Sequence, residues 1–316
     1  MTIPSARSSQ LFSRYENNPI LTPHQWPYTV NAVFNPGATL GPDGEVVLLV
    51  RVEDRSGLSH LTVARSDDGV TDWHIDPHPT IEPLTTRYEE TWGIEDPRIT
   101  KIGDEYLIAY TGVSPGGPLV ALARTTDFRT FERVCTVSPP ENKDAGLFPV
   151  RFDDRYAIIH RPVFSGNPAE AHMWISFSPD LRHWGDHMLL IESRQSTHWD
   201  REKVGLGPPP LRTDRGWLVM FHGVKMTAAG ALYRAGLAVL DLEDPTRLLT
   251  RAHEWVLGPE TAYERTGDVP GVVFPTGWVL DSEGKVRLYY GAADTCVAVA
   301  TADVDELVDF AFSHRA

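Results

Sequence analysis

The residues of this chain whose types suit chemistry are acidic and basic side chains at the ends of apolar segments. The clearest case is the segment Thr91-Trp92-Gly93-Ile94-Glu95-Asp96-Pro97-Arg98-Ile99-Thr100, in which an acidic pair precedes a proline and an arginine. A carboxyl group such as that of Asp96 can act as a general acid when its surroundings set its pKa. Pro97 predicts an extended backbone at Asp96, which would aim the carboxyl group out of a strand end. A plain surface ion pair of Asp96 or Glu95 with Arg98 is the open alternative.

Further polar residues occur at the ends of apolar segments, or just before one. The set is Asn35, Arg51, Asp54, Arg161, Lys203, His222 and Asp294. Core packing does not explain polar residues that recur at such positions, whereas loops at one end of a set of strands commonly carry binding residues. We therefore predict that these side chains gather around one ligand pocket, although each taken alone could be a solvated surface residue.

The common local motifs of nucleotide, metal and serine-hydrolase sites are missing from the sequence. It contains no G-x-x-x-x-G-K-S/T loop, no G-x-G-x-x-G fingerprint, no H-E-x-x-H and no G-x-S-x-G. His183 and His187 lie four residues apart in a turn-rich segment, so we expect surface histidines rather than metal ligands. We expect no metal and no organic cofactor.

Short β-like segments separated by turns must position these residues. Five apolar segments, at residues 46–50, 106–110, 156–160, 217–221 and 286–290, each follow a turn signal. A second type of segment, rich in small apolar residues, follows each of them and contains Ala64, Ala123, Ile175, Ala238 and Val299 in turn. A recurrence of roughly 60 residues, enough for about four short strands, is typical of a propeller blade. We therefore predict an all-β fold, a five-bladed β-propeller, in preference to a large β-sandwich. Short helices are expected only near residues 85–90 and 304–310.

Length and charge narrow the partners and the location. The chain has 316 residues, a formal net charge of −14 and two cysteines, Cys135 and Cys296. An acidic surface disfavours nucleic acid, and no segment offers the roughly 20 apolar residues of a membrane helix. Two distant cysteines favour free thiols in a reducing compartment, so we expect a cytoplasmic protein without a membrane partner. We expect residues 1–316 to form one propeller domain, with a short N-terminal extension over about residues 1–30.

Together these residues resemble glycoside hydrolase family 130, which comprises mannoside phosphorylases and related β-mannosidases. The resemblance runs from Asn18-Pro19-Ile20-Leu21 to the last predicted blade, and its most specific part is Gly93-Ile94-Glu95-Asp96-Pro97-Arg98-Ile99-Thr100. The supporting motifs are Phe34-Asn35-Pro36-Gly37-Ala38, Asn142-Lys143-Asp144, Leu147-Phe148-Pro149, His160-Arg161-Pro162, Lys203-Val204-Gly205-Leu206-Gly207-Pro208-Pro209 and Tyr289-Tyr290-Gly291-Ala292-Ala293-Asp294. The family is a five-bladed β-propeller, which agrees with the independent count of repeats.

The resemblance implies inverting phosphorolysis of β-mannosides, a hexosyl transfer in which inorganic phosphate is the co-substrate and α-D-mannose 1-phosphate is released. It makes Asp96 the general acid, with the proton passing either directly or through the 3-hydroxyl of the sugar. The implied phosphate ligands are Arg161, Lys203 and His222, with Tyr233 and Lys143 as further members. The implied ligands of the mannosyl hydroxyls are Asn35, Arg51, Asp54 and Asp294, with Glu264 in addition. Because phosphate is already an anion, such an enzyme needs one acid and a cationic cradle, whereas an inverting hydrolase also needs a base.

Two other functions stay open. A β-mannosidase on the same fold would release free mannose and would use a second carboxylate, Asp294 or Glu264, as its base. A non-catalytic propeller would bind glycans without turning them over. The linkage (β-1,2 or β-1,4) and the acceptor sugar depend on loops outside the mannosyl subsite, for which residues 85–91 and 223–232 are the candidates. A homo-oligomer is a further expectation.

Overall fold

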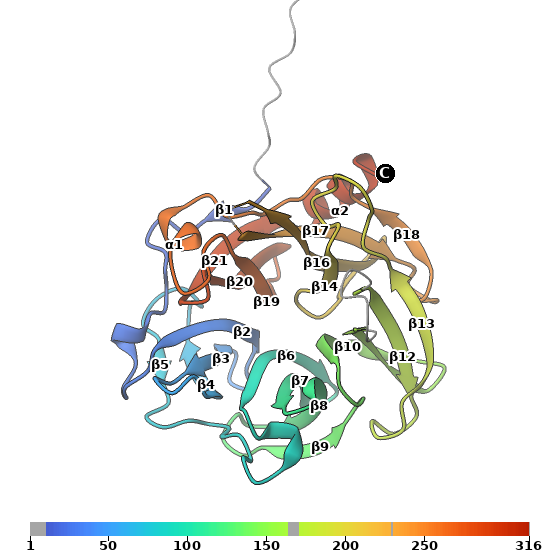
Figure 1. Cartoon of the computed structure of the whole chain (residues 1–316). Coiled ribbons are helices and arrows are strands. Elements are labelled where there is room, and N and C mark those ends of the chain that lie inside the picture. Colours follow the sequence, from blue (N-terminus) through green and yellow to red (C-terminus); the bar gives the residue numbers. More distant parts are fainter. Residues whose placement is uncertain (1–10, 164–170, 229, 316) are drawn as a thin grey trace, which may run out of the picture.

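Five antiparallel sheets surround a common axis, as the blades of a propeller do (Figure 1). The computed structural model describes residues 11–163, 171–228 and 230–315. The innermost strands of the five blades are β2 (Ala32–Leu40), β6 (Ile94–Ile102), β10 (Asn142–Phe152), β14 (Lys203–Leu206) and β19 (Val273–Leu280). The predicted five-bladed all-β architecture is therefore confirmed.

The first three blades each contain four strands that follow one another in chain order. Blade 1 contains β2 (Ala32–Leu40), β3 (Val46–Glu53), β4 (Ser59–Ser66) and β5 (His74–Ile75). Blade 2 contains β6 (Ile94–Ile102), β7 (Glu105–Ser114), β8 (Gly117–Thr125) and β9 (Glu132–Thr136). Blade 3 contains β10 (Asn142–Phe152), β11 (Arg155–Pro162), β12 (Met173–Ser178) and β13 (Gly185–Ile191).

The last two blades depart from this simple order. In blade 4 both β14 and β15 pair with β16, so the innermost strand is interrupted. Its strands are β14 (Lys203–Leu206), β15 (Leu211–Thr213), β16 (Gly216–Thr227), β17 (Gly230–Leu240) and β18 (Leu248–Arg251). In blade 5 the outer strand comes from the other end of the chain. Its strands are β19 (Val273–Leu280), β20 (Lys285–Ala292), β21 (Cys296–Asp303) and β1 (Ser13–Arg14).

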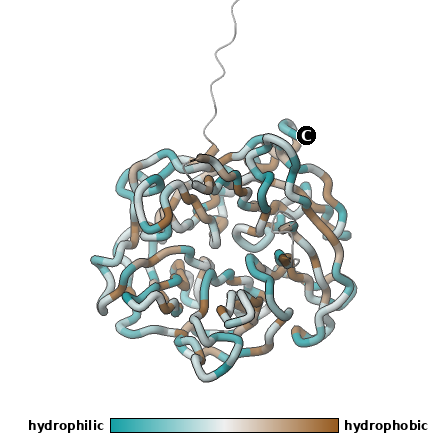
Figure 2. Tube along the Cα trace, in the orientation of Figure 1, coloured by the Kyte–Doolittle hydropathy of each residue, from teal (hydrophilic) through white to brown (hydrophobic). Residues whose placement is uncertain are grey.

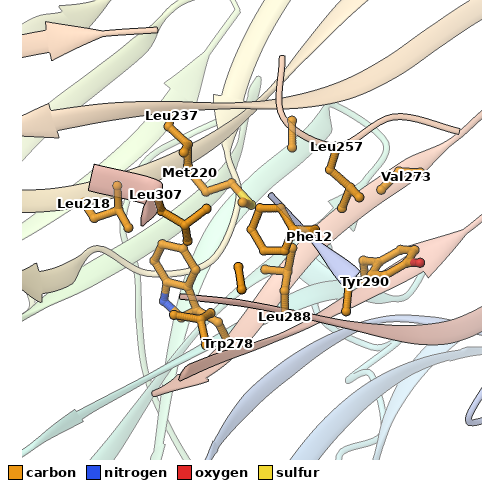
Figure 3. Close-up of a cluster of buried hydrophobic side chains, with 14 of the residues drawn as sticks. Phe12, Leu218, Met220, Leu237, Leu257, Val273, Trp278, Leu288, Tyr290 and Leu307 are labelled. Carbon is orange, nitrogen blue, oxygen red and sulfur yellow. The ribbon is translucent and has the colours of Figure 1, made fainter. Parts of the chain in front are cut away.

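The pairing of β1 with β21 closes the ring of blades. Ser13 lies opposite Thr301 and Arg14 opposite Ala300, which joins the first described residues to the last blade. Phe12, next to this strand, is fully buried among side chains of blades 4 and 5 and of helix α2 (Val304–Ser313; Figure 3). The segment predicted as an extension thus contributes a strand to blade 5, while residues 1–10 lie outside the described part.

The sequence repeat corresponds to one position in every blade. Its markers Ala64, Ala123, Ile175, Ala238 and Val299 lie in β4, β8, β12, β17 and β21, which are the third strands from the axis. All five side chains are buried. Third strands are covered on both faces by neighbouring blades, so small apolar residues recur there because of packing. Figure 2 shows hydrophobic stretches along the strands and hydrophilic residues in many of the outer loops.

Helical structure is limited to short pieces in the described residues. These are the 3₁₀ turns η1 (Pro23–Gln25) and η2 (Tyr88–Glu90) and the helices α1 (Ala262–Arg265) and α2 (Val304–Ser313). η2 and α2 confirm the predicted helical segments, whereas η1 and α1 were not predicted. Asp303 caps α2 by accepting hydrogen bonds from the backbone NH groups of Asp305 and Glu306. Within the described ranges, no helix has the length and apolar character that a membrane crossing requires.

Candidate active site

A pocket opens at the end of the axis where the innermost strands begin. Each of the five blades contributes to it, and its lining is Asn35, Arg51, Asp96, Lys143, Asp144, Arg161, Lys203, His222, Tyr233, Val269, Val272, Phe274 and Asp294. Nine of the eleven residues predicted for the site are therefore brought together in the described structure. The predicted gathering of polar residues at one mouth is correct for these nine.

β-bulges aim three of the polar side chains into this pocket. The register of β2, β6 and β10 shifts near their first residues, between Phe34 and Gly37, Glu95 and Arg98, and Lys143 and Gly146 respectively. Each bulge contains one residue with a positive φ: Asn35 at 45°, Asp96 at 51° and Asp144 at 54°. Asn and Asp tolerate this left-handed region better than other residues with a side chain. A bulge also turns the strand locally, which redirects its side chain.

The backbone of Asp96 therefore differs from the prediction. Pro97 predicted an extended conformation, but φ of Asp96 is 51°, so that prediction is wrong. The bulge between Glu95 and Arg98 prevails over the local preference because the flanking residues stay paired with β7 on both sides. The proposed surface ion pair with Arg98 is also wrong. Arg98 is buried and donates hydrogen bonds to three backbone carbonyl groups, those of Asp96, Leu206 and Gly207, at 3.0, 2.7 and 2.7 Å.

The carboxyl group of Asp96 is buried, with only 3% of the residue exposed. Its Oδ1 accepts hydrogen bonds from Asn35 Nδ2 at 2.8 Å and from Arg51 Nη1 at 3.2 Å. Burial alone would raise the pKa of Asp96, but the charges of Arg51 and Lys143 and the Asn35 hydrogen bond outweigh it and lower the pKa. Asp96 is thus ionised in the ligand-free pocket near neutral pH.

Asp294 has the opposite protonation behaviour. It lies in the turn between β20 and β21 with φ of 49°, and none of the described residues gives it a hydrogen bond or an ion pair. Burial and the nearby negative charge of Asp96 raise its pKa to about 6, although Arg51 and Lys143 act in the other direction. The pocket therefore contains two carboxyl groups whose affinities for a proton differ clearly.

Asp144 is the one polar residue of the lining that was not predicted; the apolar residues Val269, Val272 and Phe274 were not predicted either. Asp144 is 1% exposed, and its Oδ2 accepts a hydrogen bond from Arg161 Nε at 2.7 Å and lies 3.4 Å from His222 Nε2. Burial acts to raise its pKa, but the nearby charges of Arg161 and Arg98 outweigh burial and hold the pKa well below the usual range. Gly205 leaves room for this group, because a Cβ there would collide with the Asp144 carboxylate and the His222 ring. The signal in the sequence that could have identified Asp144 is its position. Asp144 lies at the start of the innermost strand of blade 3, as Asp96 does in blade 2.

The basic side chains of blades 3 and 4 lie around Asp144. Burial and the charge of Arg161 lower the pKa of Lys203 to about 8, so its amine is still mostly protonated at neutral pH. Its Nζ is 5.3 Å from the centre of the Tyr233 ring. Burial lowers the pKa of His222 to about 3, so His222 is a neutral side chain there and not the cation that we had expected. It contributes a ring and hydrogen-bonding nitrogens instead.

Asp54 and Glu264 lie outside the pocket lining. The Asp54 carboxylate is occupied by the turn after β3, where it accepts hydrogen bonds from the backbone NH groups of Ser56 and Leu58. Glu264 is fully buried in α1 and accepts hydrogen bonds from Arg14 Nε at 2.7 Å and from Tyr290 OH at 2.9 Å. Both carboxylates stabilise local structure, so their predicted contact with the sugar is not borne out by the geometry.

The charge distribution in the pocket suits an anion next to an acid. Four basic side chains, Arg51, Lys143, Arg161 and Lys203, line it together with the three carboxyl groups of Asp96, Asp144 and Asp294. Asp144 is engaged by Arg161, and Arg51 by Asp96. Because these groups converge in a largely buried pocket, a bound anion would interact with them much more strongly than in water.

Comparison with known proteins shows that this chain is similar to mannooligosaccharide phosphorylases. A family model described as beta-1,4-mannooligosaccharide phosphorylase, of glycoside hydrolase family 130, matches residues 9–312. The beta-1,4-mannooligosaccharide phosphorylase of Ruminococcus albus is 34% identical over 308 residues, which are 95% of this chain and 91% of the relative.

Solved structures agree with this match. Beta-1,2-mannobiose phosphorylase from Listeria innocua, in complex with beta-1,2-mannobiose, has a TM-score of 0.87 at 30% identity and covers 96% of this chain and 99% of its own. Another structure has a TM-score of 0.81 at 26% identity and covers 93% and 94%. It is presented under the statement that the GH130 family of mannoside phosphorylases contains glycoside hydrolases that target beta-1,2 mannosidic linkages in Candida mannan.

Proposed function

The chain belongs to glycoside hydrolase family 130, and from this premise we propose that it is an inverting β-mannoside phosphorylase. It transfers the mannosyl group of a β-mannoside to inorganic phosphate and releases α-D-mannose 1-phosphate and a shortened acceptor. The observation that carries the proposal is the group of basic side chains, Lys143, Arg161 and Lys203, in the pocket of Asp96. Water as nucleophile would not require these charges, whereas a phosphate anion does.

In this proposal Asp96 is the general acid. Bond cleavage leaves negative charge on the glycosidic oxygen, and a proton from Asp96, passed directly or through the 3-hydroxyl of the mannosyl group, neutralises it. Phosphate attacks the anomeric carbon from the opposite face, which inverts its configuration. Oδ2 of Asp96 is the oxygen that would carry the proton, because Asn35 and Arg51 both donate to Oδ1.

The phosphate would be held by the basic side chains of blades 3 and 4. Arg161 offers a planar guanidinium that suits phosphate oxygens, and Asp144 fixes it through Nε. Lys203 and Lys143 supply point charges, while Tyr233 and neutral His222 supply hydrogen-bonding groups on the same side. The lowered pKa of Lys203, about 8, would rise again when a phosphate anion binds beside it.

The mannosyl group would lie between the acid and the side chains of blades 1 and 5. Asn35 donates to Asp96 Oδ1 through Nδ2 at 2.8 Å, which places this side chain between the acid and blade 5. Arg51 and Asp294 complete this side of the pocket. We omit Asp54 and Glu264 from the proposed sugar contacts, because their carboxylates are engaged elsewhere.

The direct experiment is an incubation of the purified protein with β-1,2-mannobiose and β-1,4-mannobiose, each with and without phosphate. We expect mannose 1-phosphate from at least one of the two, and little cleavage when phosphate is omitted. Equal rates of cleavage in the presence and absence of phosphate would refute the proposal. Binding of both disaccharides without any turnover would favour the non-catalytic propeller.

A β-mannosidase is the second candidate, and one observation favours it. Asp294 has a pKa of about 6, close to the value that an enzyme needs for a general base near neutral pH. A hydrolase of this fold would use Asp294 to activate water and would release free mannose. Glu264, the other base considered, is buried against Arg14 and outside the pocket lining. The same incubation separates the two functions, because only hydrolysis continues without phosphate.

Three finer points belong to the proposal. The acceptor side would be formed by residues 85–91, which include η2, and by residues 223–232, which comprise the end of β16 and the start of β17. Of these residues, Ala229 lies outside the described part. A screen of acceptor sugars with mannose 1-phosphate tests this assignment and identifies the linkage.

The free cysteines Cys135 and Cys296 support a cytoplasmic location. Homo-oligomerisation is tested by the mass of the protein in solution.

A further inference from the structure

Arg98 is a buried cation that the proposed mechanism does not use. It is 1% exposed and lies on β6, two residues after the acid Asp96. Its Nε donates to the carbonyl group of Gly207, its Nη2 to that of Leu206 and its Nη1 to that of Asp96, at 2.7, 2.7 and 3.0 Å. A guanidinium is a rigid planar fork, so three hydrogen bonds in different directions fix both its position and its orientation.

The bond to Asp96 supports the bulge that aims the acid. Glu95 pairs with Thr111 and Arg98 with Ala109, so two residues of β6 oppose a single residue of β7. The carbonyl group of Asp96 lies within this bulge, where the ladder is locally disrupted, and it accepts its hydrogen bond from Arg98 Nη1. The side chain of Arg98 therefore holds the backbone from which the carboxyl group of Asp96 projects.

The same guanidinium holds the innermost strand of blade 4. β14 ends at Leu206, and the carbonyl groups of Leu206 and of the next residue, Gly207, both accept from Arg98. Successive carbonyl groups of a regular strand point in opposite directions, so one side chain can bind both only where the strand stops being regular. The strand that ends here begins with Lys203, which lines the pocket. Arg98 thus ties the strand of the acid to a strand of the basic cradle.

Arg98 also faces Asp144, the carboxylate that holds Arg161. Arg98 Nη2 lies 3.6 Å from Asp144 Oδ1, and Arg161 Nε donates to Oδ2 of the same carboxylate at 2.7 Å. Arg98 and Asp144 are each 1% exposed, so water screens their attraction little. One carboxylate therefore joins Arg98 to the guanidinium that is proposed to hold phosphate.

Stability alone does not account for a charge at this place. A buried ionic group is often no more stabilising than apolar side chains of similar size, whereas it does fix one geometry. We propose that Arg98 is a positioning residue of the reaction: it holds the backbone of Asp96 and the pair of Asp144 and Arg161 in one arrangement, with acid and phosphate on opposite sides of the anomeric carbon. Arg98 itself lies outside the pocket lining. This inference rests on the proposed phosphorolysis and adds to it a residue that acts through others.

Steady-state kinetics of two Arg98 variants, measured well below the Tm of each, tests the inference. Arg98→Lys keeps the cation but replaces the fork by a point charge, and Arg98→Met keeps the length but loses both. We expect kcat to fall at least about 10-fold in Arg98→Lys and roughly 100-fold in Arg98→Met, since a misplacement of about 1 Å can cost that much. KM for the mannoside should stay near the wild-type value.

Arg14→Lys is the matched control for a purely structural role. Arg14 is also largely buried, donates to a backbone carbonyl group, that of Gly258, and to a carboxylate, that of Glu264, and lies outside the pocket lining. Arg14→Lys should lower Tm and leave kcat unchanged. The same result in Arg98→Lys, a lowered Tm with the kcat of the wild type, would overturn the inference.

Asp144→Asn tests the link to Arg161, and it keeps the test available if the Arg98 variants do not fold. It leaves the three carbonyl bonds of Arg98 in place, and we expect kcat to fall at least about 10-fold. An unchanged kcat in Asp144→Asn would contradict the proposed chain of contacts.

The double variant of Arg98→Lys and Asp144→Asn shows whether the two residues act together. Its loss of kcat should be smaller than the product of the two single losses, because both changes break the same chain of contacts. A loss equal to the product would mean that Arg98 and Asp144 act independently, which overturns the inference. If the wild type cleaves mannosides equally well without phosphate, the proposed function fails, while the rate of cleavage by Arg98→Lys still decides whether Arg98 positions Asp96.

Discussion

The buried pair of Glu264 and Arg14 should contribute to stability and not to catalysis, which a substitution can test. Arg14 Nε and Nη2 donate to the two carboxylate oxygens of Glu264, at 2.7 and 3.2 Å, across 250 residues of sequence. The carboxylate also accepts hydrogen bonds from Tyr290 OH and from the backbone NH groups of Glu260 and Thr261. Glu264 therefore fixes β1 and α1 to blade 5, where the ring closes.

The magnitude follows from these contacts. Removing one partner of a buried ion pair typically costs about 3–5 kcal/mol. The Arg14 side chain is 10% exposed and keeps its hydrogen bond to the carbonyl group of Gly258, so we expect the lower end, about 3 kcal/mol, for Glu264→Ala. The entropy of unfolding, about 2.1 cal/mol/K per residue, gives a loss of about 5 °C in Tm for a chain of this length.

The assay is thermal unfolding of the purified variants together with KM for both substrates. Glu264→Ala should unfold about 5 °C below the wild type, with unchanged KM for mannoside and phosphate. Glu260→Gln is the matched control, since Glu260 also contacts Arg14 at 3.1 Å but is 45% exposed. It should cost less than about 1 kcal/mol. A Glu264→Ala variant with normal Tm and a raised KM for the mannoside would refute the reasoning and return Glu264 to the site.

Three further predictions concern the acid, the cradle and the buried histidines. Asp96→Asn should lower phosphorolysis by at least about 100-fold while Tm stays within a few degrees, as activity and unfolding measurements check; retained activity would remove Asp96 from the acid role. Lys203→Ala should raise KM for phosphate more than KM for mannoside; an unchanged phosphate dependence would contradict the cradle. His160 and His222, with pKa values lowered by burial to about 4 and about 3, bind protons only after unfolding, so stability present above pH 6.5 should be lost as pH falls. Each contributes about 1.4 kcal/mol per pH unit, and His160→Gln should flatten the slope of Tm between pH 6 and 4.5.

The fold was predictable because its signals are local and repeated. Turn residues before a β-branched segment, and small residues such as Ala64 and Ala123 in the following strand, recur in every blade. The closing strand was missed, because two residues, Ser13 and Arg14, make it and their partner strand lies at the other end of the chain. A strand this short has no periodicity of its own.

The site was predictable in membership but not in detail. Residue type and position at segment ends led to Asp96 and Arg161, but they gave equal weight to Asp54, whose carboxylate is used by its own turn. Asp144 was overlooked because its role depends on a bulge and on Arg161, which lies 17 residues away in the chain. The neutral state of His222 likewise follows from burial among side chains of several blades, which no local pattern expresses.

Phosphorus and proton nuclear magnetic resonance of a running reaction distinguishes phosphorolysis from hydrolysis by this protein. The protein is incubated with its preferred β-mannobiose and phosphate, and products are followed without separation. We expect one molecule of mannose 1-phosphate, in the α configuration, for each glycosidic bond broken, with no free mannose beyond the acceptor. Free mannose in excess of mannose 1-phosphate, or a β-configured phosphate ester, would contradict this expectation.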